Sequence, residues 1–400
     1  MNKKHYIIIG ASAAGIAAAN QIKKNNPNAE VICISKENEY PYNKCFLADY
    51  MIGAKEEKEI FLRTSLEEKD LIKDTVILID SKNKIVHCSS GRRLLCDKLL
   101  LAMGSSPFIP PLMQNNYKGM FTFHTLSDAN AILGYCKKNR ISKAVIIGAG
   151  LSGIECADAL YKNGISVSVI ERSHKILSAF LDEKSSTFLR ATIEKCGVKV
   201  YCKQTVKAIE QTNNRVTGVQ LENGDSLPTS LVIIATGLRP NISLAQHAGI
   251  MCNEYGILVN EHMQTNQADI YAAGDVIAVI DRLTNKWMGS CTWPDAMLQG
   301  MYAAHAMTNN PREYSGPSII TSSSFFDLHL AHAGILEIQE NNDMLVVKEG
   351  TDFCYRLLLQ NGMLKGFSIV GPKAIVSHIR KYILNEVLFE PTILDVLNYK

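Results

Sequence analysis

Two glycine-rich segments of the chain have the residue types and the spacing needed to hold phosphate groups. Glycines allow the backbone to turn tightly and to approach a pyrophosphate closely, while the amides at the start of a following helix stabilise its negative charge. The segments are HYIIIGASAAG, with Gly10, Ser12 and Gly15, and KAVIIGAGLSG, with Gly148, Gly150 and Gly153. Two such segments in one chain indicate two dinucleotide-binding sites.

Each segment lies in a predicted strand–turn–helix–strand unit. The first comprises strands at 6–9 and 31–35 around a helix at 16–24, and the second comprises strands at 144–147 and 167–170 around a helix at 154–163. An acid closes each unit, Glu37 or Glu171, and its carboxylate can accept hydrogen bonds from ribose hydroxyls. Glu171 would repel a 2′-phosphate, which favours NADH, whereas the neighbouring Arg172 leaves NADPH open. Ser12 replaces the middle glycine of the first turn and adds a hydroxyl donor.

Three further predicted strands end in small or acidic residues. Strands at 98–102 and 231–235 run into Gly104 and Gly237, where a small residue lets the backbone approach a cofactor or cross between domains. The strand in DIYAAGDV ends at Asp275. The carboxylate of Asp275 could hold a sugar-alcohol hydroxyl, or it could cap a helix.

The composition excludes several classes of protein. With 400 residues, 46% apolar and 20% charged, we expect a globular enzyme of two or three domains. A formal net charge of +3, without a basic block, argues against nucleic acid, and no apolar run approaches a membrane span. The eleven cysteines show no CxxC pair and no metal-ligand spacing, so we expect reduced thiols and no metal. The N-terminal residues do not resemble a signal peptide, and a cytoplasmic location is expected.

In their order, five segments resemble the pyridine nucleotide–disulfide oxidoreductase superfamily, across essentially the whole chain. They are GASAAG, LLLAMGSSP, VIIGAGLSG, VIIATGLRPN and IYAAGDV. The resemblance implies an α/β fold with two Rossmann-like domains of the three-layer ββα type and a small α+β C-terminal domain. The implied FAD-binding domain is 1–111 with 241–315, the NAD(P)H-binding domain is 112–240, and the C-terminal domain is 316–400. In the last we expect a hairpin at Asn361-Gly362 and a helix over 373–387.

The resemblance also implies which residues contact each dinucleotide. For FAD these are Gly10, Ser12, Ala14, Gly15, Glu37, Lys44, Val76, Ala102, Gly104, Asp275 and Trp293. For NAD(P)H they are Gly148, Gly150, Leu151, Ser152, Gly153, Glu171 and Gly237. Glu155 matches a position that approaches the nicotinamide in relatives, and the plain alternative is a glutamate on a helix surface.

The segment Pro41-Tyr42-Asn43-Lys44-Cys45 supports two hypotheses. PYNK resembles the PY(N/D)R segment of rubredoxin reductases, ferredoxin reductases and nitrite reductase flavin domains, with Lys44 keeping the charge of the usual arginine but not its forked geometry. Cys45 matches the single redox cysteine of coenzyme A disulfide reductases and NADH oxidases, whose thiolate lies beside the flavin. A cysteine that only fills space against the flavin ring is the alternative. The Cys-x4-Cys pair of glutathione reductases is absent, and Ala13 stands where peroxidase-type relatives carry histidine.

The implied function is that of an FAD-dependent, NADH-preferring oxidoreductase, monomeric or homodimeric, with Lys44, Cys45 and Glu155 as candidate catalytic residues. Hydride would pass from NADH to flavin N5, and electrons would continue to a small redox protein such as rubredoxin or ferredoxin. One alternative is a thiol enzyme in which Cys45 reduces coenzyme A disulfide, persulfide or polysulfide. Another is a flavin-bound redox sensor, which would bind FAD and NADH tightly but show little turnover.

Overall fold

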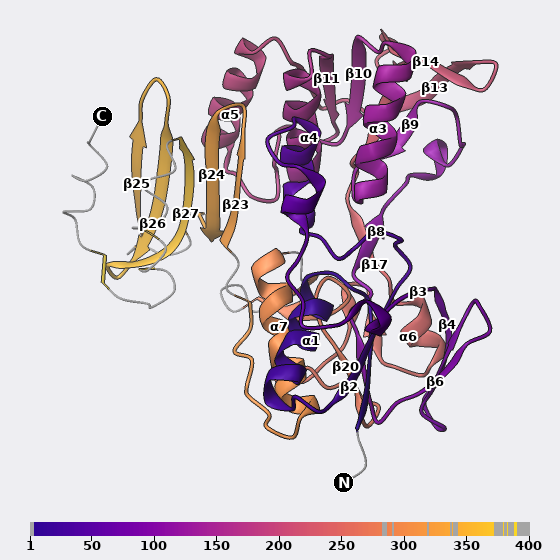
Figure 1. Ribbon diagram of the computed structural model, residues 1–400. Coiled ribbons are helices and arrows are strands. Elements are labelled where there is room, and N and C mark those ends of the chain that lie inside the picture. Colours follow the sequence, from indigo (N-terminus) through magenta and orange to yellow (C-terminus); the bar gives the residue numbers. More distant parts are fainter. Residues whose placement is uncertain are drawn as a thin grey trace. The chain divides into compact units, whose positions relative to one another are not determined.

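A computed structural model describes residues 4–281, 286–289, 292–317, 320–336, 338, 343–371, 379, 382, 388 and 389. The chain divides into two compact units (Figure 1). Unit 1 comprises Met1–Phe46, Lys55–Ser106 and Leu238–Ser318, and unit 2 comprises Leu47–Ala54, Pro107–Gly237 and Ile319–Lys400. The finer division into three domains stays a prediction.

Unit 1 is built around a five-stranded parallel sheet with the strand order β20-β7-β1-β2-β3. The strands are β1 (His5–Ile9), β2 (Glu30–Ser35), β3 (Leu71–Lys73), β7 (Lys98–Leu101) and β20 (Ile270–Ala272). The central strands are continuous apolar runs because both faces of the sheet are covered. Since β1, β7 and β20 run parallel and in register, their carboxyl ends meet at one edge. Gly10, Ala102 and Asp275 follow these three ends.

Helices α1 (Ala13–Asn25) and α7 (Trp293–Met307) pack against each other in unit 1 (Figure 1). A three-stranded antiparallel sheet, in which Ile79 and Val86 are buried, shares their hydrophobic core. Its strands are β4 (Val76–Asp80), β5 (Ile85–Cys88) and β6 (Arg93–Leu95). The shorter elements are β8 (Ser105–Pro107), β17 (Leu238–Pro240), α6 (Ser243–His247), β18 (Cys252–Asn253), β19 (Gly256–Ile257), β21 (Ala278–Ile280), β22 (Trp287–Gly289) and the 3₁₀ turns Lys44–Phe46, Glu57–Ile60 and Glu68–Asp70. A further 3₁₀ turn, Pro111–Met113, belongs to unit 2.

Unit 2 contains a second parallel sheet of the same kind, with the order β12-β11-β10-β16-β9. Its strands are β9 (Met120–Thr122), β10 (Lys143–Ile147), β11 (Ser166–Glu171), β12 (Lys199–Cys202) and β16 (Val232–Ile234). The helices are α2 (Leu47–Met51), α3 (Leu126–Asn139), α4 (Leu151–Lys162) and α5 (Glu183–Lys195). An antiparallel sheet is formed by β13 (Val206–Thr212), β14 (Arg215–Leu221) and β15 (Ser226–Pro228).

The C-terminal part of unit 2 is a five-stranded antiparallel sheet with the order β23-β24-β27-β26-β25 (Figure 1). The strands are β23 (Ile320–Phe325), β24 (Leu328–Gly334), β25 (Asp343–Glu349), β26 (Cys354–Gln360) and β27 (Met363–Gly371). Asn361 (φ +51°) and Gly362 (φ +76°) form the tight turn between β26 and β27, as their left-handed preference predicts. The helix expected over 373–387 lies outside the described residues.

The sequence pattern placed the two dinucleotide helices too late in the chain. α1 begins at Ala13 rather than at 16, and α4 begins at Leu151 rather than at 154. The last glycine of each motif, Gly15 or Gly153, lies inside the first helical turn, because that turn packs directly on the strand. The α/β class with parallel sheets is confirmed. No helix in the described part of the chain is long and apolar enough to span a membrane.

Candidate functional site

The turn after β1 can be formed only by glycine. Gly10 has a φ of +112°, and a Cβ atom placed on it would lie 2.0 Å from the carbonyl oxygen of Ala102 at the end of β7. A Cβ on Gly15 would lie 1.8 Å from the carbonyl oxygen of Gly10. The first turn of α1 therefore packs against the strand ends without any intervening side chain. This packing brings together Gly10, Gly15 and Ala102, all three predicted from the sequence to contact FAD.

The turn after β10 repeats this construction in unit 2. Gly148 has a φ of +106° and approaches the carbonyl oxygen of Ala235 at the end of β16, where an added Cβ would lie at 2.2 Å. Gly153 approaches the carbonyl oxygen of Gly148 in the same way, with 2.1 Å to an added Cβ. At Gly150, the N-cap of α4, an added Cβ would meet no protein atom within 4 Å. The middle of this turn thus presents open backbone in front of a helix N-terminus.

A second glycine with positive φ follows the end of β7 in unit 1 and the end of β16 in unit 2. Gly104 (φ +62°) and Gly237 (φ +113°) come shortly after Ala102 and Ala235, and an added Cβ on either glycine would meet nothing within 4 Å. Ser12, the N-cap of α1, makes no side-chain capping hydrogen bond. Each turn therefore places backbone amides at a helix start beside tightly packed strand ends, with Ser12 in place of the middle glycine in the first turn, and this arrangement suits a diphosphate.

The glutamates that follow the two strand–turn–helix–strand segments, Glu37 and Glu171, have different hydrogen-bond partners. Glu37 accepts hydrogen bonds from the Tyr42 hydroxyl (2.5 Å) and from the Lys44 ammonium (2.9 Å). Glu171 accepts hydrogen bonds from backbone amides, that of Ala149 in the glycine turn (2.8 Å) and that of Ser173 (2.7 Å). A carboxylate can accept about four hydrogen bonds, so hydrogen bonds from ribose hydroxyls could be added to the two from backbone amides at Glu171.

Asp275 follows β20 at the edge where the first glycine turn lies. The Ser105 hydroxyl donates a hydrogen bond to its Oδ2 (3.2 Å). Burial raises the pKa of Asp275 to about 6, against the lowering effects of the Ser105 hydrogen bond and the nearby positive charge of Lys44. Glu37, Lys44, Ser105 and Asp275 thus form one polar cluster in unit 1. Ser105 lies in the GSSP segment, but nothing in the sequence indicated that it contacts Asp275.

Lys44 and Cys45 lie in a single 3₁₀ turn, Lys44–Phe46. Besides its ion pair with Glu37, the Lys44 ammonium lies 5.9 Å from the centre of the Tyr42 ring. The backbone amide of Cys45 donates to the Asn43 side chain (2.9 Å), which fixes the start of the turn. Among the cysteines in the described part of the chain, Cys45 is the only exposed one.

Glu155, on α4, is fastened to the C-terminal sheet of the same unit. The Ser323 hydroxyl on β23 donates to its Oε1 at 2.5 Å. Burial raises the pKa of Glu155 to about 7, and the Asp49 carboxylate raises it further while Ser323 lowers it. Glu155 is thus half-buried on α4 and hydrogen-bonded to the neighbouring sheet. Ser323 had no signal in the sequence, because it lies 168 residues away from Glu155.

The remaining predicted residues lie at the edges of these features. Val76 begins β4 and Trp293 begins α7, and both side chains are partly buried against the core of unit 1. Ala14 lies in the first turn of α1, and Leu151 and Ser152 lie in the first turn of α4.

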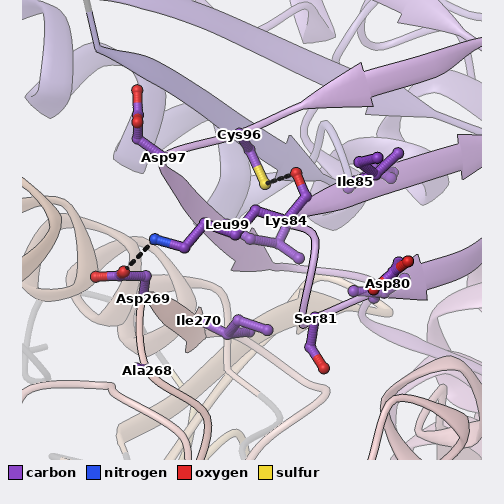
Figure 2. Close-up of a pocket in the computed structure, with 12 residues that line it drawn as sticks. Asp80, Ser81, Lys84, Ile85, Cys96, Asp97, Leu99, Ala268, Asp269 and Ile270 are labelled. Carbon is purple, nitrogen blue, oxygen red and sulfur yellow. Dashed lines mark hydrogen bonds and ion pairs between the residues drawn. The ribbon is translucent and has the colours of Figure 1, made fainter.

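A small pocket lies at the edge of the unit 1 sheet that is opposite to the glycine turn (Figure 2). It lies at the amino ends of β7 and β20, whereas ligands of open α/β sheets bind at the carboxyl ends. The Lys84 and Lys98 ammonium groups both bind Asp269, at 2.6 and 2.7 Å, and the Cys96 thiol donates to the Lys84 carbonyl (3.5 Å). These groups pair with one another and close the edge of the sheet.

Comparison with known proteins decides the family. A family model described as pyridine nucleotide-disulphide oxidoreductase matches residues 4–300. The chain belongs to this family. It is 33% identical over 346 residues to an NADH oxidase of Methanocaldococcus jannaschii, covering 84% of this chain and 77% of that one. It is 30% identical over 359 residues to an NAD(P)H sulfur oxidoreductase (CoA-dependent) of Pyrococcus abyssi, covering 88% of this chain and 78% of that one.

A solved structure supports the same assignment at the level of the fold. The chain is similar to a covalent complex of putidaredoxin reductase with putidaredoxin, with a TM-score of 0.88, 25% identity and coverage of 98% of this chain and 96% of that chain. The sequence resemblance is thereby confirmed, and the protein is an FAD-dependent NAD(P)H oxidoreductase. The two glycine turns, each followed by a carboxylate, fit the two dinucleotides that this family uses.

Proposed function

We propose that the enzyme oxidises NADH at the second glycine turn and, through FAD at the first, reduces a small redox protein. The observation that carries this proposal is the repeated construction of the two turns, Gly10 against Ala102 and Gly148 against Ala235. FAD, when bound, accepts a hydride from NADH and returns the two electrons to an acceptor. The chain's own residues bind the two dinucleotides and exclude other orientations.

In this proposal the polar cluster of unit 1 orients FAD. The amides of the first turn bind the diphosphate, and Glu37 accepts hydrogen bonds from the adenosine ribose while Tyr42 and Lys44 hold its carboxylate in place. Asp275, itself held by Ser105, binds a hydroxyl of the ribityl chain. Lys44 supplies the positive charge of the cluster, which counters the two carboxylates and the diphosphate.

The preference for NADH rests on Glu171. In the part of the chain that the structure describes, its hydrogen bonds come from backbone amides and it makes no ion pair, so its negative charge would repel the 2′-phosphate of NADPH. The test is a comparison of kcat/KM for NADH and NADPH in the wild type and in Glu171→Gln, with Arg172→Gln as the control. The ratio in favour of NADH should fall about tenfold in Glu171→Gln. An unchanged ratio would remove Glu171 as the selecting residue.

Transfer to a small redox protein is supported by the similarity to putidaredoxin reductase in complex with its carrier. The exposed thiol of Cys45 and the similarity to a CoA-dependent sulfur oxidoreductase favour a second candidate, in which Cys45 attacks a disulfide or persulfide of coenzyme A. The Cys45 thiolate would form a disulfide with coenzyme A, breaking the substrate's sulfur–sulfur bond and releasing coenzyme A thiolate from the disulfide or hydrosulfide from the persulfide. Reduced FAD would supply the two electrons that cleave this mixed disulfide into coenzyme A thiolate and the Cys45 thiolate. Replacing Cys45 with serine should abolish this activity but preserve reduction of a carrier protein.

Anaerobic titration of the purified holoprotein with NADH distinguishes the two candidates. Full bleaching by one equivalent, without a long-wavelength thiolate–flavin band, would mean that flavin is the single redox centre and would support the carrier reductase. Uptake of two equivalents, with such a band after the first, would show that Cys45 starts as a mixed disulfide or a sulfenic acid, which takes up two electrons, and is therefore redox-active. The thiol enzyme would then replace the carrier reductase as the function. The same titration of Cys45→Ser should give one equivalent in either case.

A further inference from the structure

Two adjacent residues on α7 contact two parts of the proposed FAD site: Gln299 contacts the turn that carries Asp275, and Gly300 contacts the first turn of α1. Gln299 is fully buried, with 0% of its surface exposed. Its Oε1 accepts a hydrogen bond from the backbone amide of Gly274 (2.8 Å), the residue immediately before Asp275. Its Nε2 donates to the hydroxyl of Tyr314 (3.2 Å). The side chain amide is thus held from both ends, and one end reaches the backbone of the turn that carries Asp275.

Gly300 packs against the first turn of α1, which follows the first glycine turn. A Cβ atom on Gly300 would lie 2.1 Å from the carbonyl oxygen of Ala14, in the first turn of α1. A Cβ on Gly274 would lie 3.1 Å from the Cβ of Ala14. The first turn of α1, the Gly274-Asp275 turn and α7 are therefore packed without room for adjustment. Any rotation of α7 would move the diphosphate cradle and the ribityl-binding carboxylate together.

We propose that Gln299 is a positioning residue for FAD: it holds the Gly274-Asp275 turn in the conformation that binds the cofactor, while Gly300 sets the helix against the diphosphate turn. This inference rests on the proposed FAD site and deepens it. Gln299 does not touch the cofactor in this role and acts through the backbone amide of Gly274. A buried amide that loses its acceptor destabilises the conformation that buries it, so the turn would take up other conformations, and FAD would have to restore the correct one on binding.

The test is FAD affinity in Gln299→Met, which keeps the length of the side chain but removes both polar atoms. The apoprotein is titrated with FAD, and quenching of flavin fluorescence gives the dissociation constant. We expect it to rise about 10- to 100-fold. NADH affinity, measured on the same apoprotein through NADH fluorescence, should stay unchanged. Gln299→Glu keeps an acceptor facing the Gly274 amide and should restore most of the FAD affinity.

A destabilised control separates positioning from a general loss of stability. Ile22→Val removes one methyl group from a fully buried residue of α1, and it should lower the unfolding temperature of the apoprotein without changing FAD affinity. Unchanged FAD affinity in Gln299→Met, or an equal loss of FAD and NADH affinity, would overturn the inference. Failure of Gln299→Glu to recover any affinity would also overturn it. If the wild-type apoprotein bound no FAD, the proposed function itself would fail, which the titration of the wild type shows by itself.

Discussion

Replacement of Glu155 by glutamine should stabilise the protein at pH 8 but hardly at pH 4.5. Burial raises the pKa of Glu155 from 4.5 to about 7 in the folded state. A raised pKa means that the folded state binds this proton more tightly than the unfolded chain does. The resulting stability is fully present below pH 4.5 and is lost as the pH rises to about 7. Each pKa unit corresponds to about 1.4 kcal/mol, so the ionised carboxylate destabilises the fold by about 3 kcal/mol above pH 7.

Glutamine occupies the same volume and can accept the hydrogen bond from Ser323, but it carries no charge at any pH. Urea unfolding of the apoprotein at pH 5 and pH 8, followed by far-UV circular dichroism, gives the free energy of unfolding of both proteins. The advantage of Glu155→Gln over the wild type should grow by about 2 to 3 kcal/mol between these pH values. Glu222→Gln, at an exposed position of the same unit, is the control and should show no such growth. A difference that is the same at pH 5 and pH 8 would refute the reasoning.

Alanine at Gly150 should weaken NADH binding by about tenfold or more without lowering the unfolding temperature, because its Cβ meets no protein atom within 4 Å; NADH titration and thermal unfolding measure both. Alanine at Gly10 should lower the unfolding temperature as well as the flavin content of the purified protein, since its Cβ would lie 2.0 Å from the Ala102 carbonyl oxygen. The wild type should lose free energy of unfolding in acid because of His332, and His332→Asn should not show this loss. Burial lowers the pKa of His332 from 6.5 to about 4, so the wild type should lose about 3 kcal/mol as the pH falls between these values, which urea unfolding at pH 4.5 and pH 7 tests.

The glycine turns could be predicted from the sequence because their constraints are local. A buried strand, a residue with positive φ and the start of a helix follow one another within a few residues, as at Gly10 and Gly148, and each leaves a recognisable residue type. The same holds for the Asn361-Gly362 hairpin. Even here the pattern missed the first helical turns, because the glycine inside each turn is chosen for its contact with the strand and not for helix propensity.

The partners of the site residues could not be predicted, because they come from distant parts of the chain. Ser323 reaches Glu155 across 168 residues and Gln299 reaches Gly274 across 25, and neither pair leaves a periodicity or a motif. Only the packing of α4 on β23, and of α7 behind β20, brings them together. The sequence therefore identified Glu155 as a candidate but not the burial that raises its pKa, and it gave no indication of Gln299.

If the first turn binds FAD and the second binds NADH, as we propose, the shared motif does not by itself decide which dinucleotide a turn binds. In both motifs glycines pack the first helical turn against the strand ends. A glutamate then follows the next strand, although not at the same position: Glu171 is the last residue of β11, and Glu37 comes two residues after the end of β2. The difference lies in what holds that glutamate: Lys44 pairs with Glu37 at 2.9 Å, whereas Glu171 is bound to backbone amides. Glu37 is balanced by the Lys44 cation, which also lies near Asp275. This arrangement suits the negative charge of FAD, which we propose for the first site. Within the described residues Glu171 makes no ion pair. Its carboxylate would admit free ribose hydroxyls and disfavour an additional phosphate, so the proposed selectivity for NADH would arise from the partners of the motif and not from its glycines.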